Sequence, residues 1–119
     1  MPSPNLVVLY VQDPTASSRF YRKLLDREPD ASFPTYVTFD LENGLTLGLW
    51  SAARVSPPPP EFGNRSEIAF SVGDQMAVEA LFRDWNGTGV TIEQEPWEDV
   101  FGLTFVALDP DGHRIRVCS

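Results

Sequence analysis

Histidine and cysteine, two residue types that often act in acid–base and nucleophilic catalysis, are scarce in this chain. It has one histidine, His113, and one cysteine, Cys118. His113 follows Gly112 at the expected exit of a hairpin, where many polar residues suit a turn, so we interpret it as a turn residue. A single cysteine allows neither an intrachain disulfide nor a zinc site built from cysteines. No glycine-rich phosphate loop and no Ser/His/Asp or Cys/His signature can be placed, so no catalytic residue is assigned.

The charge balance excludes two classes of partner. The chain of 119 residues has 17 acidic and 9 basic residues, which gives a net charge of −8. Such a surface repels a phosphate backbone or an anionic membrane, so we expect no nucleic-acid and no membrane partner. No apolar run approaches the roughly 18 residues that span a bilayer. The first residues lack the basic stretch and long apolar region of a secretion signal, and we predict a cytoplasmic protein.

The elements that must position any site are repeated along the chain. Residues 6–13 and 67–74 both read as an apolar strand followed by an aspartate, and each aspartate precedes an amphipathic helix. The offset is 74 − 13 = 61 residues, about half of the chain. Each half alone would have a marginal core, so we predict one domain built from two copies of a module. A fold of this kind is expected to place a cleft where the copies meet.

Local signals outline each module. Asp13 and Pro14 suit the N-cap and first position of a helix, and Asn43-Gly44 is a strong hairpin turn. In the first module we predict strands at 6–12, 36–41 and 45–50, with the helix ending before Pro29. In the second, Asp74 caps the helix, 97–102 is a loop, and strands lie at 67–72, about 91–95, 103–108 and 114–118.

Three short motifs support a family resemblance. They are residues 11–13, residues 20–25 on the first helix, and residues 109–113 before the last strand. With the repeated strand–helix–strand order, the chain resembles the vicinal oxygen chelate superfamily, which includes glyoxalase I, bleomycin-resistance proteins, fosfomycin-resistance proteins and extradiol dioxygenases. The resemblance implies an α+β fold in which two pseudo-symmetric βαβββ-type modules form a cup-shaped mixed sheet with helices outside. We place the modules at about 5–51 and 66–119, joined by a proline-rich connector at 52–65 within a single domain 1–119. The resemblance also implies a homodimer.

Metal-dependent members of that superfamily hold their ion with four ligands, and the resemblance carries these positions onto four residues here. They are Leu6, Gly48, Glu67 and Arg116. Leucine and glycine have no donor side chain, and arginine is a permanent cation that repels a divalent ion. Glu67 alone falls short of the three or more ligands such a site needs. We therefore predict no metal and no cofactor.

Other side chains are expected to line the cup instead. Glu67 and Arg116 would pair directly or through water across its floor; in the alternative, Arg116 points to solvent near a frayed C-terminus. Strand alternation places Tyr10 in the cup with Leu6, and Trp50 with Gly48. Trp97 and Phe101 in the 97–102 loop resemble an element that stacks on planar ligands in drug-binding relatives, although both could simply cover the core.

We therefore predict a metal-free protein that binds a planar or aromatic small molecule, resembling the bleomycin-resistance proteins. The alternative is a glyoxalase-type lyase or isomerase, or a dioxygenase-like enzyme, with a metal held by Glu67 and acidic residues such as Asp40, Glu93 or Glu95. A third possibility is a structural or regulatory dimer whose cup is filled by side chains. The predicted ligand-binding residues are Trp50, Glu67, Trp97, Phe101 and Arg116.

Overall fold

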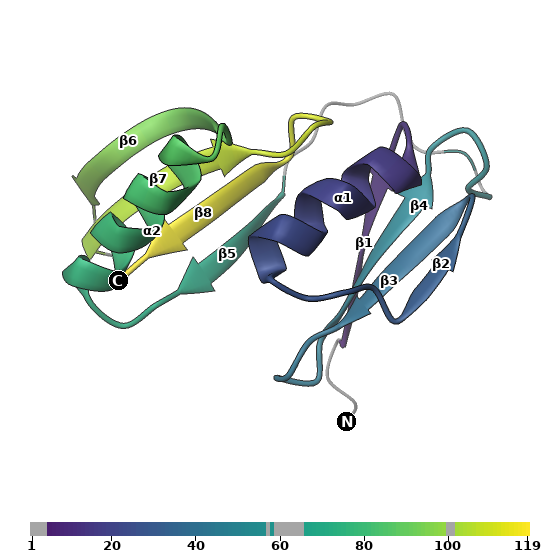
Figure 1. Ribbon diagram of the computed structural model, residues 1–119, viewed down its shortest axis with the longest axis horizontal. Helices are drawn as coiled ribbons and strands as arrows, with labels where there is room; N and C mark the ends of the chain where they lie inside the picture. The colour runs from purple at the N-terminus through teal and green to yellow at the C-terminus, as the bar shows by residue number, and fades with distance from the viewer. Residues whose placement is uncertain (1–4, 57, 59–65, 100–101) are drawn as a thin grey trace. The chain divides into compact units, whose positions relative to one another are not determined.

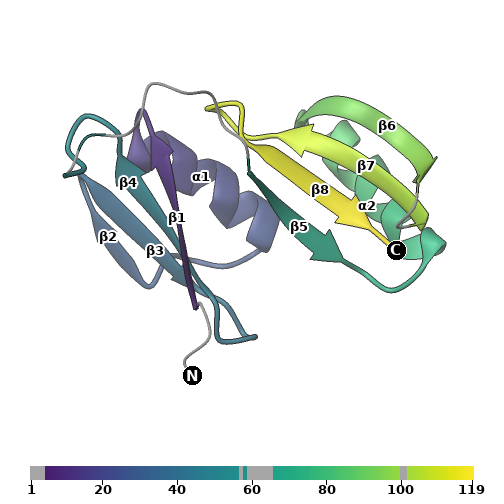
Figure 2. The same cartoon turned by 180° about the vertical axis from the view of Figure 1, so that it is seen from behind.

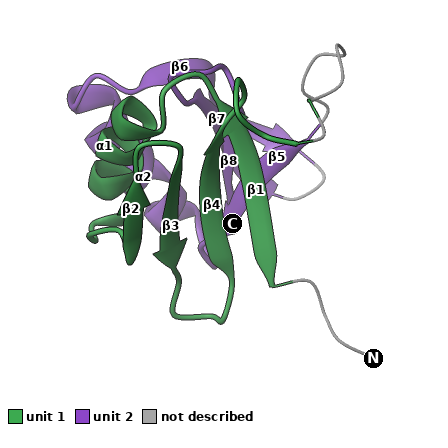
Figure 3. Cartoon of the chain, turned by 90° about the vertical axis from the view of Figure 1, so that its right-hand side faces the viewer, with its two compact units in different colours: residues 1–62 green, residues 63–119 purple. Residues whose placement is uncertain are grey.

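The computed structural model describes residues 5–56, 58, 66–99 and 102–119. The chain divides into two compact units, residues 1–62 and 63–119, coloured separately in Figure 3. Each unit has one described helix and a four-stranded mixed sheet, and within the described residues neither sheet closes into a barrel. The α+β class with two βαβββ modules is confirmed. No described helix has the length and apolar character that crossing a membrane requires.

The first unit consists of β1 (Leu6–Val11), α1 (Pro14–Leu25), β2 (Ala31–Phe33), β3 (Tyr36–Asp40) and β4 (Thr46–Ser51). Its strands lie in the order β1-β4-β3-β2, with α1 against one face of the sheet (Figure 1). β1 runs parallel to β4, and the other pairs are antiparallel. The first and last strands of the module therefore lie side by side, which requires the helical crossover between them.

Asp13 and Pro14 occupy the predicted N-cap and first helical position of α1. The Asp13 carboxylate accepts a hydrogen bond from the backbone N–H of Thr15 at 3.0 Å, and Pro14 occupies the first helical position. This satisfies one of the N–H groups that the helix leaves unpaired. The helix ends at Leu25, and the C-cap residue Asp26 has a left-handed φ of 51°. These local interactions fix where α1 begins and ends over its sheet.

The short strand β2 was not predicted. Its three residues lie between Asp30 and Pro34, so they are too few to show an alternating pattern. Asp30 secures the pairing with β3, because its N–H donates to the Thr38 carbonyl oxygen at 2.8 Å and its carboxylate accepts from the Asp40 N–H at 2.6 Å. β2 therefore adds a fourth strand next to β3.

The second unit repeats this arrangement with β5 (Glu67–Ser71), α2 (Gln75–Gly87), β6 (Thr91–Asp99), β7 (Gly102–Leu108) and β8 (Arg114–Cys118). The strand order is β5-β8-β7-β6, and β5 is parallel to β8 (Figure 2). Asp74 caps α2 by accepting from the Ala77 N–H at 2.8 Å. The repeat in the sequence is thus a repeat in the fold.

The predicted loop at 97–102 was wrong over its first half, because β6 continues through Trp97 to Asp99. Two shifts interrupt its pairing with β7, one between Ile92 and Gln94 and one between Gln94 and Trp97. Pro96 lies within the second shift. β6 is an edge strand, where a proline and β-bulges are tolerated, and both obscure the alternation by which a strand is predicted.

Each sheet buries the face that its own helix covers. In the first unit this core includes Tyr21 from α1 with Val11, Val37, Phe39 and Leu49, all at most 1% exposed. In the second unit it includes Val78 and Trp85 from α2 with Phe105, Ile115 and Val117, all at most 5% exposed. Val7 alternates onto the same face as Val11 but is 37% exposed, since it lies near the start of the edge strand β1.

Candidate functional site

Four aromatic side chains form a row across the sheet of the first unit. Tyr10 on β1 lies opposite Trp50 on β4, Trp50 lies opposite Tyr36 on β3, and Tyr36 lies opposite Phe33 on β2. Residues directly opposite each other on paired strands share a face of the sheet. We call Tyr10, Trp50, Tyr36 and Phe33 the aromatic row. It contains one residue from every strand of this sheet.

The aromatic row lies on the face away from α1. Leu49 and Val37, which alternate with row residues along β4 and β3, are 0% and 1% exposed in the helix-covered core. By contrast, Tyr10 is 42% and Phe33 is 61% exposed, and Trp50 and Tyr36 are half-buried. The row therefore offers aromatic surface that the described part of this unit does not fully cover.

The two central rings of the row are held against each other. The ring centroids of Tyr36 and Trp50 are 5.6 Å apart, and the ring planes are inclined at 66° in an edge-to-face arrangement. Tyr36 also lies over the backbone of Gly48, because a Cβ placed on that glycine would be 2.8 Å from the Tyr36 Oη. An aromatic pair in this arrangement contributes roughly 0.5–1.5 kcal/mol beyond burial of its area.

Sequence reasoning identified only part of this row. Alternation placed Trp50 and Tyr10 on a common face, and their direct pairing confirms it. Phe33 was missed because β2 was not predicted, and Tyr36 because its face depends on the register with β4. The available signal was the run from Phe33 to Tyr36, in which two aromatic residues flank Pro34 and Thr35.

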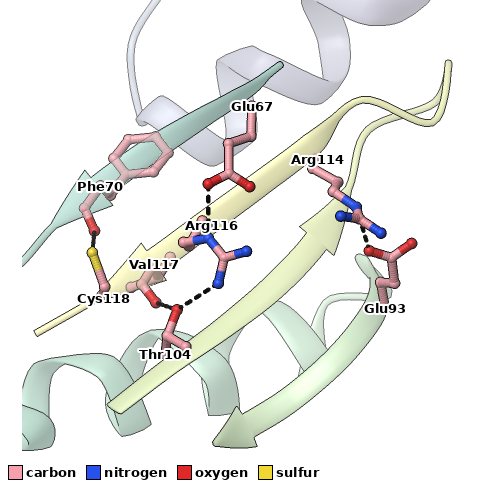
Figure 4. Close-up of polar contacts among 8 residues, drawn as sticks. All are labelled: Glu67, Phe70, Glu93, Thr104, Arg114, Arg116, Val117 and Cys118. Carbon is pink, nitrogen blue, oxygen red and sulfur yellow. Dashed lines mark hydrogen bonds and ion pairs between the residues drawn. The ribbon is translucent and has the colours of Figure 1, made fainter. Parts of the chain in front are cut away.

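The face of the second sheet away from α2 carries a network of polar side chains. The Arg116 Nε donates to the Glu67 Oε1 at 2.8 Å, and the Arg116 Nη1 donates to the Thr104 Oγ1 at 3.3 Å (Figure 4). The Thr104 hydroxyl donates in turn to the Val117 carbonyl oxygen at 2.8 Å. We call Glu67, Arg116 and Thr104 the polar network. It links β5, β8 and β7.

The hypothesis that Glu67 and Arg116 pair directly agrees with this geometry, whereas the alternative of an arginine in solvent does not. The side chain of Arg116 is only 17% exposed and that of Glu67 is 35% exposed. The hydrogen bond from Arg116 to Glu67 raises the pKa of Arg116, so the guanidinium stays charged. Thr104, which is 0% exposed, was not predicted as part of this network.

A second ion pair lies on the same face. The Arg114 Nε is 2.7 Å from the Glu93 Oε1 on β6, with side chains 56% and 36% exposed (Figure 4). Arg114 and Arg116 are two residues apart on β8, yet they reach toward opposite edges of the sheet. Each arginine thus has a glutamate beside it, which balances the charge of these four side chains.

The two remaining predicted residues have different outcomes. Trp97 lies opposite Thr104 in the pairing of β6 and β7, so it is on the same face as the polar network, and it is 60% exposed. It therefore does not cover the core of this unit. Phe101 lies outside the described residues.

The four positions that the resemblance assigns to metal ligands do not fit an ion. Leu6 is 49% exposed and has no donor atom, and the Tyr36 ring covers Gly48. Arg116 is a cation that already holds the Glu67 carboxylate. Among the acidic residues of the alternative set, Asp40 accepts a hydrogen bond from Thr46 at 2.9 Å, and Glu93 pairs with Arg114. These side chains therefore do not support a metal-dependent step.

One cluster of potential ligands occurs elsewhere, in the turn between β7 and β8. Donor atoms of Asp109, Asp111 and His113 lie within 4.8 Å of one another. One Asp109 oxygen accepts from the backbone N–H groups of Asp111 and His113 at 2.9 and 2.8 Å, and the other is 2.7 Å from the His113 Nδ1. The cluster is therefore a hydrogen-bonded turn, as predicted for His113.

This turn should give a pH-dependent contribution to stability. The hydrogen bond to Asp109 raises the pKa of His113 above 6.5, against the opposing effect of burial. The charged pair thus stabilises the fold fully below the unfolded pKa of about 6.5, and this contribution is lost as pH rises through the folded pKa. We expect the difference in unfolding free energy between wild type and His113→Asn, measured in urea, to be larger at about pH 6 than at about pH 9. A difference that is constant or grows with pH would contradict the assignment.

Comparisons with known proteins agree with this architecture. Residues 3–117 match the family described as the Glyoxalase/Bleomycin resistance protein/Dioxygenase superfamily. The phenazine antibiotic resistance protein EhpR of Enterobacter agglomerans is 36% identical over 119 residues, covering 98% of this chain and 91% of EhpR.

The similar solved structures include the following two. Protein ATC0852 from Agrobacterium tumefaciens, solved by NMR in solution, is 43% identical with a TM-score of 0.89, covering 100% of this chain and 98% of that one. A glyoxalase-related enzyme from Fulvimarina pelagi shares the fold at 21% identity, with a TM-score of 0.84 over 99% of this chain and 88% of its own. The chain belongs to the glyoxalase, bleomycin resistance protein and dioxygenase superfamily.

Proposed function

We propose that this protein binds a planar aromatic small molecule without the help of a metal ion. The observation that carries the proposal is the aromatic row of the first unit, in which every strand contributes one ring to the same exposed face. Small-molecule sites are mostly apolar and aromatic, with a few polar groups that orient the ligand. Affinity would come from burial of ring surface and from stacking, and no bond in the ligand needs to change.

The relative EhpR suggests the class of ligand. Its name describes resistance to phenazine antibiotics, and phenazines are flat, fused aromatic ring systems. At 36% identity over nearly the whole of both chains, a ligand of related chemistry is a reasonable expectation for this protein. We propose that it sequesters a phenazine-like compound, which would lower the free concentration of that compound.

The second unit has candidate ligand contacts of its own. We propose that Arg116, steadied by Glu67 and Thr104, offers hydrogen-bond donors to a ligand, and that Trp97 adds an exposed ring. Because Glu67 already balances its charge, Arg116 would orient a ligand more than it would attract an anion.

Phe101 keeps its predicted role as a ligand-binding residue. The single domain, the homodimer, the cytoplasmic location and the absence of nucleic-acid and membrane partners also remain predictions.

Titration of the intrinsic tryptophan fluorescence with phenazine tests the proposal. The chain has three tryptophans, and Trp50 lies in the aromatic row. We expect saturable quenching by phenazine and little effect from 1-adamantanol, an apolar molecule of similar bulk that is not planar. Equal responses to both would indicate unspecific apolar binding, and no saturable response to phenazine would contradict the proposed function.

A further inference from the structure

We infer that Gly48 is a specificity-determining residue, because its missing side chain admits the Tyr36 ring to the ligand-binding face. This inference rests on the proposed function and deepens it. Gly48 lies in the middle of β4, opposite Val8 on β1 and Thr38 on β3. Its role would be to position Tyr36 beside Trp50, so that both rings contact the same planar ligand.

The backbone gives no reason for a glycine at this position. Gly44 and Gly112 occupy turns with φ of 85°, where other residues would be strained, but Gly48 is not among the glycines with positive φ. A glycine inside a strand weakens it, and it often marks a place where another group approaches the backbone closely. At Gly48 the approaching group is the ring of Tyr36.

The approach is too close for any other residue unless the ring moves. A Cβ on Gly48 would be 2.8 Å from the Tyr36 Oη, 3.1 Å from its Cε1 and 3.2 Å from its Cζ. These atoms are at the far end of a side chain that can rotate, so an added methyl group would displace the ring rather than the strand. The displaced ring would then lose its edge-to-face contact with Trp50, whose centroid is 5.6 Å away.

The resemblance gives this glycine further meaning. Gly48 is the position at which metal-dependent relatives are expected to carry a ligand on the last strand of the first module. In this chain the Tyr36 ring covers that position. A metal-binding side chain at position 48 and the Tyr36 ring would therefore exclude each other. This chain has an aromatic surface where a metal-binding side chain would otherwise lie.

The experiment is a double-mutant cycle read out by calorimetric titration with phenazine. We expect Gly48→Ala to weaken binding about tenfold in the wild-type background and to have no further effect in a Tyr36→Ala background, where no ring remains to be displaced. Gly87→Ala is the matched control, since nothing lies within 4 Å of a Cβ added there, and its affinity should stay within about twofold of wild type.

The results distinguish a failure of the inference about Gly48 from a failure of the proposed function. If Gly48→Ala binds phenazine as wild type does, or loses the same factor in both backgrounds, the inference is overturned while the proposed function stands. If the wild type itself does not bind phenazine, the proposed function fails. Should Gly48→Ala fail to fold by circular dichroism, Tyr36→Leu keeps Gly48 and must by itself weaken binding; unchanged affinity in that variant also overturns the inference.

Discussion

Replacing Phe105 with alanine should lower the free energy of unfolding by about 3–5 kcal/mol, the typical loss for a large aromatic residue in a core. Phe105 on β7 is 0% exposed. Its ring centroid is 5.5 Å from that of Phe82 and 5.4 Å from that of Trp85, both on α2. Truncation would leave a cavity between the helix and the sheet that the rigid neighbours cannot fill. Urea unfolding followed by circular dichroism measures the loss.

Phe33→Ala is the matched control for this prediction. It removes the same side chain from β2 of the first unit, where Phe33 is 61% exposed. Little apolar area is uncovered there, so we expect a loss below about 1 kcal/mol. Similar losses in the two variants would mean that Phe105 does not lie in the core described above.

Replacing Trp50 with alanine should weaken phenazine binding by about 30-fold, because truncation of an aromatic anchor typically costs 2 kcal/mol or more. Trp50 occupies the centre of the aromatic row, between Tyr10 and Tyr36. Its removal deletes one ring and also frees Tyr36 from its edge-to-face contact. Trp50→Phe should retain a large part of the affinity, since it keeps an aromatic face. Isothermal titration calorimetry measures the affinity for phenazine of the wild type, Trp50→Ala and Trp50→Phe.

Met76→Ala serves as the control for unspecific effects on binding. Met76 is 79% exposed on α2, in the other unit and outside the aromatic row. Its affinity for phenazine should match that of the wild type. If Trp50→Ala binds as tightly as Met76→Ala, the aromatic row is not the stacking surface.

Much of the fold could be predicted from the sequence because local signals mark where helices and turns begin, and most of these signals occur once in each unit. The caps at Asp13 and Asp74 each act within three residues, and the Asn43-Gly44 turn sets its own hairpin. Local interactions of this kind do not depend on the rest of the chain. The repeat then determined the order of elements in both units, and the structure follows that order.

The parts that were missed depend on the register of one strand against its neighbour. β2 is defined by its register with β3, and the end of β6 is defined by two shifts against β7 that no local pattern reveals. The aromatic row exists only through the register of four strands, so Phe33 and Tyr36 could not be joined to Trp50 from spacing alone.

The polar network shows the same division. The family resemblance led to the prediction that Glu67 and Arg116 pair. In the structure the Arg116 Nε lies 2.8 Å from the Glu67 Oε1. Thr104 was missed, although alternation around the buried Phe105 places a hydroxyl on the opposite face of β7. Its role became visible only with the bond from Arg116, which crosses from β8 to β7.

The central claim is that aromatic surface binds the ligand and that no metal takes part. The most direct test is a calorimetric titration of the wild-type protein with phenazine after dialysis against EDTA, repeated after addition of Zn²⁺, Mn²⁺ or Mg²⁺. We predict saturable binding to the chelator-treated protein, with an affinity that none of the three ions changes by more than about twofold. Binding that requires one of these ions, or no binding under any of the conditions, would contradict the account.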